Sequence, residues 1–161
     1  FDDSARMWGD PEVTRYIGGR PSTEQQAWAR FLRYPGHWTM LGYGYWVVVE
    51  KATGGFVGEV GFADFRREMT PSFHGVPEAG WALAPWAHGK GFATEAVTAA
   101  LAWADEIILS SRSVCLIDPP HAVSIRVAEK CGYRSLGEGT YEGAPTLIFE
   151  RKRPSHSERP I

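Results

Sequence analysis

The stretch Trp86-Ala-His-Gly-Lys-Gly-Phe-Ala-Thr-Glu-Ala96 decides the fold, because it joins a buried strand to a long helix. Before it, the apolar run 79–84 stops at Pro85, which is typical of a buried strand. After it, apolar residues recur every three or four positions, which predicts an amphipathic helix over 92–109. Gly89 and Gly91 therefore lie in the turn where the strand gives way to the helix.

This strand–turn–helix arrangement favours an anion-binding site. The first turn of a helix leaves backbone N–H groups unpaired and carries the positive end of the helix dipole. Glycine lets the backbone approach a ligand closely and adopt positive φ, so phosphate or pyrophosphate fits best. The pattern is neither of the familiar nucleotide motifs, because Phe92 follows Gly91 and Thr94 replaces a third glycine. A tight turn without a ligand is the alternative.

Two motifs carry a more specific resemblance. The string Gly89-Lys-Gly-Phe-Ala-Thr-Glu-Ala96 is similar to the acetyl-CoA signature of GNAT N-acetyltransferases, in the form found in ribosomal-protein N-terminal acetyltransferases (the RimJ/RimL type). The block Asp118-Pro-Pro-His-Ala-Val-Ser, continuing to Lys130-Cys-Gly-Tyr133, resembles the second motif of that branch. The resemblance covers about 54–153 and implies an α/β fold with a V-shaped splay between its central strands.

Composition agrees with one globular domain. The chain has 161 residues, with 43% hydrophobic and 22% charged side chains, which is ordinary for a globular protein. A net charge of −2 argues against a nucleic-acid partner, and no apolar run reaches membrane-spanning length. Two cysteines do not form a disulfide framework, so we expect a reducing cytoplasm. The histidines and cysteines lack metal-ligand spacing, so we expect no metal.

The expected elements give a mixed sheet flanked by helices. Short helices are expected near the start, with Asp10 as a cap and Gly18-Gly19 after the second. A helix over 22–32 is expected to begin with a Ser22–Gln25 capping box and to stop at Pro35-Gly36. The remaining expected elements are strands at 45–50, 56–62, 79–84 and 112–117, a loop at 66–77, a helix at 122–131 and two strands around Gly143.

The expected boundaries place the domain at 1–153 and a flexible tail at 154–161, which is polar and flanked by prolines. If the resemblance holds, the first strand of the family fold is expected upstream of Phe1.

Acetyl transfer to an amine requires a base, because an ammonium of the lysine type has a pKa of about 10. Glu78 is the first choice, since many GNAT enzymes hold a catalytic glutamate near this position. Glu59 is the second, on the neighbouring strand, where alternation separates it from Val60 and Phe62. For both, a solvated carboxylate at a strand end is the alternative.

The resemblance also suggests the other site residues. The backbone N–H of Leu83 would stabilise the developing oxyanion, since in this superfamily that strand carries a bulge. Ser124 would hydrogen-bond the thiol sulfur, or else merely cap its helix. The residues expected to bind acetyl-CoA are Trp81, Leu83, His88, Gly89, Lys90, Gly91, Phe92, Ala93, Thr94, His121 and Ser124.

Some residues depart from the family pattern. The tyrosine that many GNAT enzymes use as an acid is replaced by Ala128, and His88 and His121 differ from the usual residues. These departures support an alternative function, a catalytically silent acyl-CoA-binding or regulatory domain. The favoured function is an acetyl-CoA-dependent N-acetyltransferase that modifies a primary amine directly.

The expected acceptor is a peptide N-terminus or a small amino-acid-like amine. The candidate cleft segments mix acidic and basic residues, whereas a pocket for polyamines or aminoglycosides usually has an acidic lining. The cleft segments are also rich in aromatic residues, namely Trp8, Tyr16, Trp38, Phe65 and Phe73. No nucleic acid or membrane partner is expected, and the resemblance leaves a homodimer open.

Overall fold

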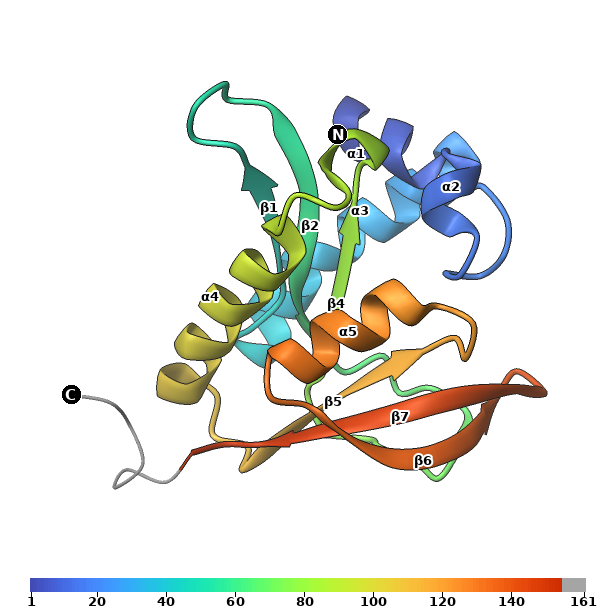
Figure 1. Cartoon of the computed structure of the whole chain (residues 1–161), viewed down its shortest axis with the longest axis vertical. Helices are drawn as coiled ribbons and strands as arrows, with labels where there is room; N and C mark the ends of the chain where they lie inside the picture. The colour runs from blue at the N-terminus through green and yellow to red at the C-terminus, as the bar shows by residue number, and fades with distance from the viewer. Residues whose placement is uncertain (155–161) are drawn as a thin grey trace.

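The computed structural model describes residues 1–154 as a seven-stranded mixed sheet between two layers of helices (Figure 1). The strand order is β1-β2-β4-β5-β7-β6-β3. The strands are β1 (Tyr45–Val49), β2 (Phe56–Ala63), β3 (Met69–Thr70), β4 (Glu78–Leu83), β5 (Arg112–Ile117), β6 (Arg134–Tyr141) and β7 (Ala144–Lys152). The helices are α1 (Asp2–Trp8), α2 (Pro11–Thr14), α3 (Glu24–Leu41), the 3-10 turn η1 (Pro85–Ala87), α4 (Phe92–Ile107) and α5 (Ala122–Lys130).

The sheet opens at its centre, between β4 and β5. These neighbours are parallel and are paired only at Glu78–Val114, where the Val114 N–H also donates to the Pro77 carbonyl at 3.0 Å. All other neighbouring strands are antiparallel, and β2–β4 and β5–β7 pair over six residues each. Because β4 and β5 diverge after one pair, the expected V-shaped splay is confirmed.

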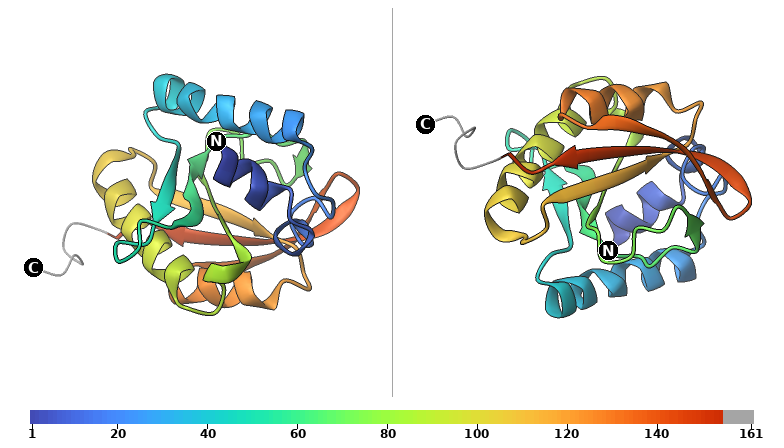
Figure 2. Two further views of the ribbon diagram at one scale, coloured as in Figure 1. Left: turned by 90° about the horizontal axis from the view of Figure 1, so that it is seen from above. Right: turned by 90° about the horizontal axis from the view of Figure 1, so that it is seen from below.

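Helices cover both faces of the sheet, with α4 and α5 on one face and α1 and α3 on the other (Figure 2). The larger core lies under α4 and α5, where Val60 and Phe62 of β2 meet Val97 and Leu101 of α4. The smaller core lies under α1 and α3 and includes Trp8. The mixed α/β fold predicted from the sequence is confirmed.

The third helix differs from its prediction. It begins at Glu24, with Thr23 rather than Ser22 as its cap, and Thr23 and Gln26 form a capping box. It continues through Pro35 and Gly36 and ends at Leu41, so the predicted stop at these residues is wrong. Trp38, in this extension, donates a hydrogen bond to the Tyr45 carbonyl at 3.0 Å and packs on neighbouring tryptophans, so tertiary contacts outweigh the local breaker.

Two smaller expectations are also wrong. The segment 66–77 contains the short strand β3, which pairs with the end of β6 at the edge of the sheet. The bulge expected in β4 is absent along its described length, because its register with β2 runs unbroken from Gly58–Leu83 to Ala63–Glu78. The unpaired backbone groups of β4 therefore result from the divergence of β5, and not from a bulge residue inserted in β4.

Several local signals are confirmed. The Asp10 side chain caps α2 by accepting from the Glu12 N–H at 2.8 Å, with Pro11 at the first helical position. That helix ends at Thr14, before the predicted end at Gly18-Gly19, and the Thr14 carbonyl accepts from the Gly19 N–H. The part of the predicted tail that follows Pro154 lies outside the described residues. No helix in the described part of the chain combines the length and apolarity needed to cross a bilayer.

Candidate active site

The loop before α4 has the geometry that its glycines predict. Gly89 and Gly91 have φ of 72° and 87°, in the left-handed region that only glycine adopts without strain. A Cβ at either position would meet nothing within 4 Å, so both face open space. Gly91 is the N-cap of α4, and no side chain of residues 1–154 caps this helix. The N–H groups of its first turn are therefore free to bind an anion.

The side chains of His88 and Lys90 in this loop both contact other parts of the protein. The His88 ring donates through Nε2 to the Leu83 carbonyl at 2.9 Å, and its Nδ1 lies 3.5 Å from a Glu12 carboxylate oxygen. Lys90 places its Nζ 4.9 Å from the centre of the Trp86 ring, in a cation–π contact. His88 therefore braces the loop against β4, and backbone groups are the donors that face the open space.

A groove of about 490 Å³ runs from this loop to the splay between β4 and β5. It is lined by Trp81, Leu83, Gly89, Gly91 and further residues of the predicted set, with Lys90 the exception. The remaining predicted lining residues are His88, Phe92, Ala93, Thr94, His121 and Ser124. Arg15, Arg126 and Lys130 also line it, against one carboxylate, Glu12, and this excess of basic residues suits an anionic ligand.

The edge of β4 in the splay offers unpaired backbone donors. The Ala84 N–H donates to the Val57 carbonyl of β2 at 2.9 Å, and alternate residues of an antiparallel strand direct their backbone groups to opposite sides. Leu83 therefore directs its N–H away from β2, towards the side from which β5 has diverged. This is the position that the family resemblance implied for an oxyanion donor.

The start of α5 forms the opposite side of the splay. His121 is the N-cap residue, its ring stacks on Tyr16 with centroids 4.6 Å apart, and its Nε2 lies 3.3 Å from Ser124 Oγ. Burial lowers the pKa of His121; Asp118 opposes this shift and His88 adds to it. The imidazole is therefore neutral at neutral pH. Ser124 is buried and lines the groove as well as the pocket on its other side.

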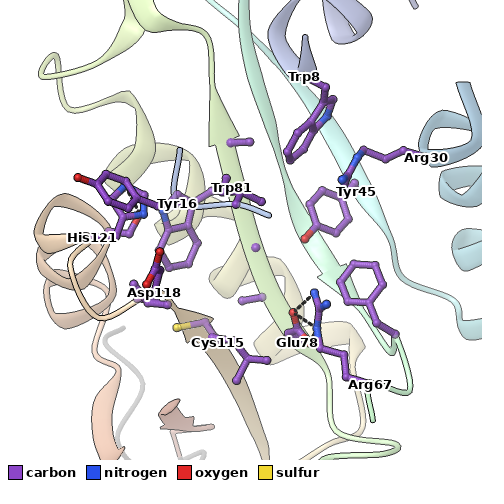
Figure 3. Close-up of a pocket in the computed structure, with 18 of the residues that line it drawn as sticks. Trp8, Tyr16, Arg30, Tyr45, Arg67, Glu78, Trp81, Cys115, Asp118 and His121 are labelled. Carbon is purple, nitrogen blue, oxygen red and sulfur yellow. Dashed lines mark hydrogen bonds and ion pairs between the residues drawn. The ribbon is translucent and has the colours of Figure 1, made fainter. Parts of the chain in front are cut away.

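This second cavity, the inner pocket, has a volume of about 140 Å³ (Figure 3). It shares Tyr16, Trp81, His121 and Ser124 with the groove, so the two cavities meet at the splay. Its remaining walls come from α1, α3, the start of β1, the strands β4 and β5, and the segment after β2. A ligand in the groove and a second one in the inner pocket would therefore meet beside Trp81 and Ser124.

Glu78 lines the inner pocket, but Arg67 holds its carboxylate (Figure 3). The Arg67 Nε lies 2.8 Å from one carboxylate oxygen, and Nη2 lies 2.8 Å from the other. Burial alone would lower the pKa of Arg67, but the hydrogen bonds and charge of Glu78 raise it overall. Glu78 thus lines the inner pocket three residues before Trp81 on β4, with both oxygens already accepting hydrogen bonds.

Glu59 lies apart from both cavities and is 1% exposed. Its oxygens accept hydrogen bonds from Ser4 Oγ at 2.5 Å, from Trp8 Nε1 at 3.0 Å and from the Tyr34 hydroxyl. The alternation predicted for β2 is correct, since Val60 and Phe62 face the core under α4. Glu59 therefore ties α1 and α3 to the sheet, and it is neither a solvated carboxylate nor part of a cavity wall.

Comparison with known proteins agrees with this geometry. Residues 1–134 match the family model described as the acetyltransferase (GNAT) domain. The chain belongs to the GNAT acetyltransferase family. It is 31% identical to the uncharacterized protein YkkB of Bacillus subtilis (strain 168), over 93% of this chain and 87% of that protein.

Solved structures show the same GNAT fold. A GnaT-family acetyltransferase from Bordetella pertussis is 35% identical, with a TM-score of 0.78 over 92% of this chain and 90% of that one. The aminoglycoside acetyltransferase AAC(6')-Ib, solved with coenzyme A and kanamycin, is 16% identical, with a TM-score of 0.75 over 92% and 87% of the two chains. At that identity the second likeness shows the fold alone.

The GNAT domain has functional candidates that its sequence did not reveal. Arg30, Arg33, His37 and Tyr45 all line the inner pocket. The spacing of Arg30, Arg33 and His37 marks one face of a helix, but this signal was lost because the helix was predicted to end before His37. Of the aromatic residues expected in the cleft, Trp8, Tyr16 and Phe65 line this pocket, whereas Trp38 and Phe73 do not.

Among residues 1–154 of this GNAT domain, no group of three or more His, Cys, Asp or Glu side chains is arranged to hold a metal ion. Cys115 and Cys131 are free and buried, and burial is the main cause that raises the pKa of both thiols.

Proposed function

We propose that this GNAT domain is an acetyl-CoA-dependent N-acetyltransferase that transfers an acetyl group directly to a primary amine. The observation that carries the proposal is the meeting of two cavities at the splay: the groove at the N-terminus of α4 and the inner pocket. The groove combines free helix N–H groups with an excess of basic residues, which suits the phosphates of a CoA thioester.

The proposed roles follow from where each group lies. The bound cosubstrate supplies an activated acetyl thioester. Backbone N–H groups from Gly89 to Thr94 bind its pyrophosphate, and the Leu83 N–H stabilises the oxyanion that forms at the acetyl carbonyl. Ser124 Oγ donates a hydrogen bond to the thiol sulfur, near the point where the two cavities meet.

The amine must lose a proton before or during its attack on the carbonyl. Glu78 remains the proposed base, because it lines the inner pocket and Glu59 does not. Since Arg67 occupies both oxygens of Glu78, we propose that a water bonded to Glu78 relays the proton. Such a relay would give Glu78→Gln a lower kcat with little change in the KM of acetyl-CoA.

Binding is tested by calorimetric titration with acetyl-CoA and with CoA. The native protein should bind both, and Gly91→Trp should abolish binding because the indole enters the groove. Gly143→Trp is a matched control, since Gly143 also has positive φ, of 77°, and open space, but lies in the distant β6–β7 turn. Absence of binding at millimolar ligand would contradict the proposal.

Turnover is tested by CoA release with a panel of amines that includes amino acids, short peptides, spermidine and kanamycin. The rival function is a silent acyl-CoA-binding domain, which is supported by Ala128 at the family's tyrosine position. Binding of acetyl-CoA without turnover on every amine would favour that rival. We propose the cytoplasm as the location, because both cysteines are free thiols.

A further inference from the structure

One face of α3 presents two arginines and a histidine to the inner pocket. Arg30, Arg33 and His37 are spaced at i, i+3 and i+7, so they lie along one side of the helix, and all three line the pocket. Arg67 also lines the pocket, on the same side of β4 as Arg30 (Figure 3). A fold that only needed to close this cavity could have done so with apolar side chains.

These arginines differ in whether a carboxylate neutralises them. Arg67 is clamped by Glu78. Neither Arg30 nor Arg33 forms an ion pair within the described residues 1–154, and the Nε of Arg30 is shielded from solvent without a hydrogen-bond partner there. The Arg30 guanidinium instead lies 3.8 Å over the Trp8 ring (Figure 3). Two positive charges thus face the cavity without a counter-ion.

The buried carboxylate of Glu59 does not pair with them, because its oxygens accept from Ser4, Trp8 and Tyr34. Burial lowers the pKa of Arg33, and the positive charge of Arg30 lowers it further. A hydrogen-bond donor that is shielded from solvent beside a like charge raises the free energy of the fold unless a ligand supplies an acceptor and an opposite charge. An anion bound between the two guanidinium groups would supply both the hydrogen bonds and the charge.

The far wall of the pocket has the opposite character. There Asp118 lies beside His121, next to Trp81 and Ser124, where the pocket meets the groove (Figure 3). An amine that arrives as an ammonium is favoured near Asp118, and an anion is favoured at α3. The pocket therefore suits a molecule that carries both charges.

We propose that the acceptor is an amino-acid-like amine whose carboxylate, or another oxyanion, binds Arg30 and Arg33 while its amine lies at the splay. This inference rests on the proposed N-acetyltransferase function and narrows its substrate class. It predicts that polycationic acceptors such as kanamycin or spermidine are poor substrates, because they would bring further positive charge next to Arg30 and Arg33.

The test compares each amino acid with its carboxamide, which keeps the amine but removes the negative charge of the carboxylate. The probes are the twenty protein amino acids and their amides, with rates expressed per unprotonated amine. The native enzyme should prefer the acid by roughly 10- to 100-fold in kcat/KM, as expected for a charged hydrogen-bond pair. A series of α-, β- and γ-amino acids and an aminophosphonate then identifies the spacing and the oxyanion.

Three variants locate the preference. Arg30→Gln and Arg33→Gln should each raise the KM of the acid severalfold, and the double variant should remove the preference for acid over amide. The KM of acetyl-CoA should stay unchanged. Arg6→Gln is the control, because Arg6 is 76% exposed and lies on α1. Equal use of acid and amide by the native enzyme, or a preference that survives in the double variant, overturns the inference.

Failure of the proposed function gives a different result. If no amine is acetylated, calorimetry with N-acetyl amino acids and CoA-saturated protein still tests the anion site. Binding that the double variant loses would support the site even though the proposed reaction fails. If the native protein binds none of these acids, the anion site is wrong, whatever the outcome with acetyl-CoA.

Discussion

Glu59 is the residue whose position most changes the chemistry expected from the sequence. Strand alternation predicted its face correctly, but the three groups that bind it lie 25 to 55 residues away along the chain, and no local pattern could reveal them. The same is true of Arg67, which lies in a loop with no periodicity and donates a hydrogen bond to Glu78. The sequence therefore suggested Glu78 and Glu59 as candidate bases. Only the tertiary contacts distinguish Glu78, which lines the inner pocket, from Glu59, which ties helices to the sheet.

The structure predicts that Glu59→Gln reduces stability more than it reduces chemistry. The amide would present an N–H₂ donor to groups that are themselves donors, leaving one of them unsatisfied in a buried site. We expect a loss of about 1–3 kcal/mol in the free energy of unfolding, measured by urea denaturation. Glu138→Gln, at an exposed position on β6, is the control and should have almost no effect.

Activity measured on folded Glu59→Gln completes this test. With acetyl-CoA and a competent amine, kcat should stay within a few fold of the native value. A selective collapse of kcat without loss of stability would instead identify Glu59 as the base.

His121 and His37 make stability depend on pH near neutrality. Burial is the main cause that lowers the pKa of both imidazoles in the folded state. The unfolded chain gains these protons near pH 6.5, whereas the folded chain gains them only at lower pH. The stabilising contribution is thus complete above pH 6.5 and is lost as the pH falls through the folded pKa values.

Urea denaturation between pH 7.5 and 5.5 measures this dependence. Stability should fall with pH in the native protein and less steeply in His121→Asn. His74→Asn, at an exposed loop position, is the control and should keep the native slope. An unchanged slope in His121→Asn would show that this imidazole does not carry the effect.

At the scale of elements, α3 shows how a strong local breaker can be overridden. Pro35 and Gly36 stand in the helix interior, where Pro removes one hydrogen bond and Gly adds conformational freedom to the unfolded chain. The contacts of Trp38 with Tyr45, Trp46 and Trp103 lie beyond the two breakers and fix the last turns against the sheet. Sequence periodicity predicted α4, β5 and α5 well because no such conflict exists there.

Gly36→Ala should therefore stabilise the protein. A Cβ at Gly36 meets nothing within 4 Å, and its φ is not positive, so alanine fits without strain. We expect a gain of about 0.5–1 kcal/mol in the free energy of unfolding, the usual difference between Gly and Ala in a helix. Gly42→Ala is the contrasting control, because Gly42 has φ of 74° at the end of α3 and should lose stability. A loss in Gly36→Ala would contradict a helical Gly36.

Contact between β1 and β4 fixes a wall of the inner pocket. A Cβ on Gly80 would lie 2.0 Å from the Tyr45 hydroxyl oxygen and 3.2 Å from the ring carbon that carries it. Gly80→Ala should displace the Tyr45 ring and cost about 1–3 kcal/mol. The variant Gly80→Ala/Tyr45→Phe should recover much of that loss, because it removes the hydroxyl that clashes.

Thermal or urea unfolding of the four proteins in this cycle measures the coupling. Tyr45→Phe alone is the matched control for loss of the hydroxyl. Additive effects of the two substitutions would show that the clash is relieved in another way.

At the scale of the whole molecule, the splay is the feature that the residues alone could not reveal. It requires β4 and β5 to be parallel neighbours joined at one pair, which depends on the crossover through α4 and on the antiparallel strands at either side. The family resemblance predicted the splay. No sequence motif predicted that Arg30 and Arg33 of α3 line the inner pocket. The family resemblance thus supplied the shape of the site, whereas its cationic side chains are brought together only by the fold of this chain.

The single pair between β4 and β5 has a consequence for amide hydrogen exchange. Amides in the middle of a sheet are normally among the slowest to exchange, because only global opening exposes them. Here Leu83 should exchange rapidly while its neighbour Ala82, paired with Glu59 of β2, stays protected. Acetyl-CoA should slow Leu83 and leave Ala82 unchanged. Residue-resolved exchange by NMR would thus report occupancy of the splay from one amide, and slow exchange of Leu83 in the free protein would mean that the gap is closed.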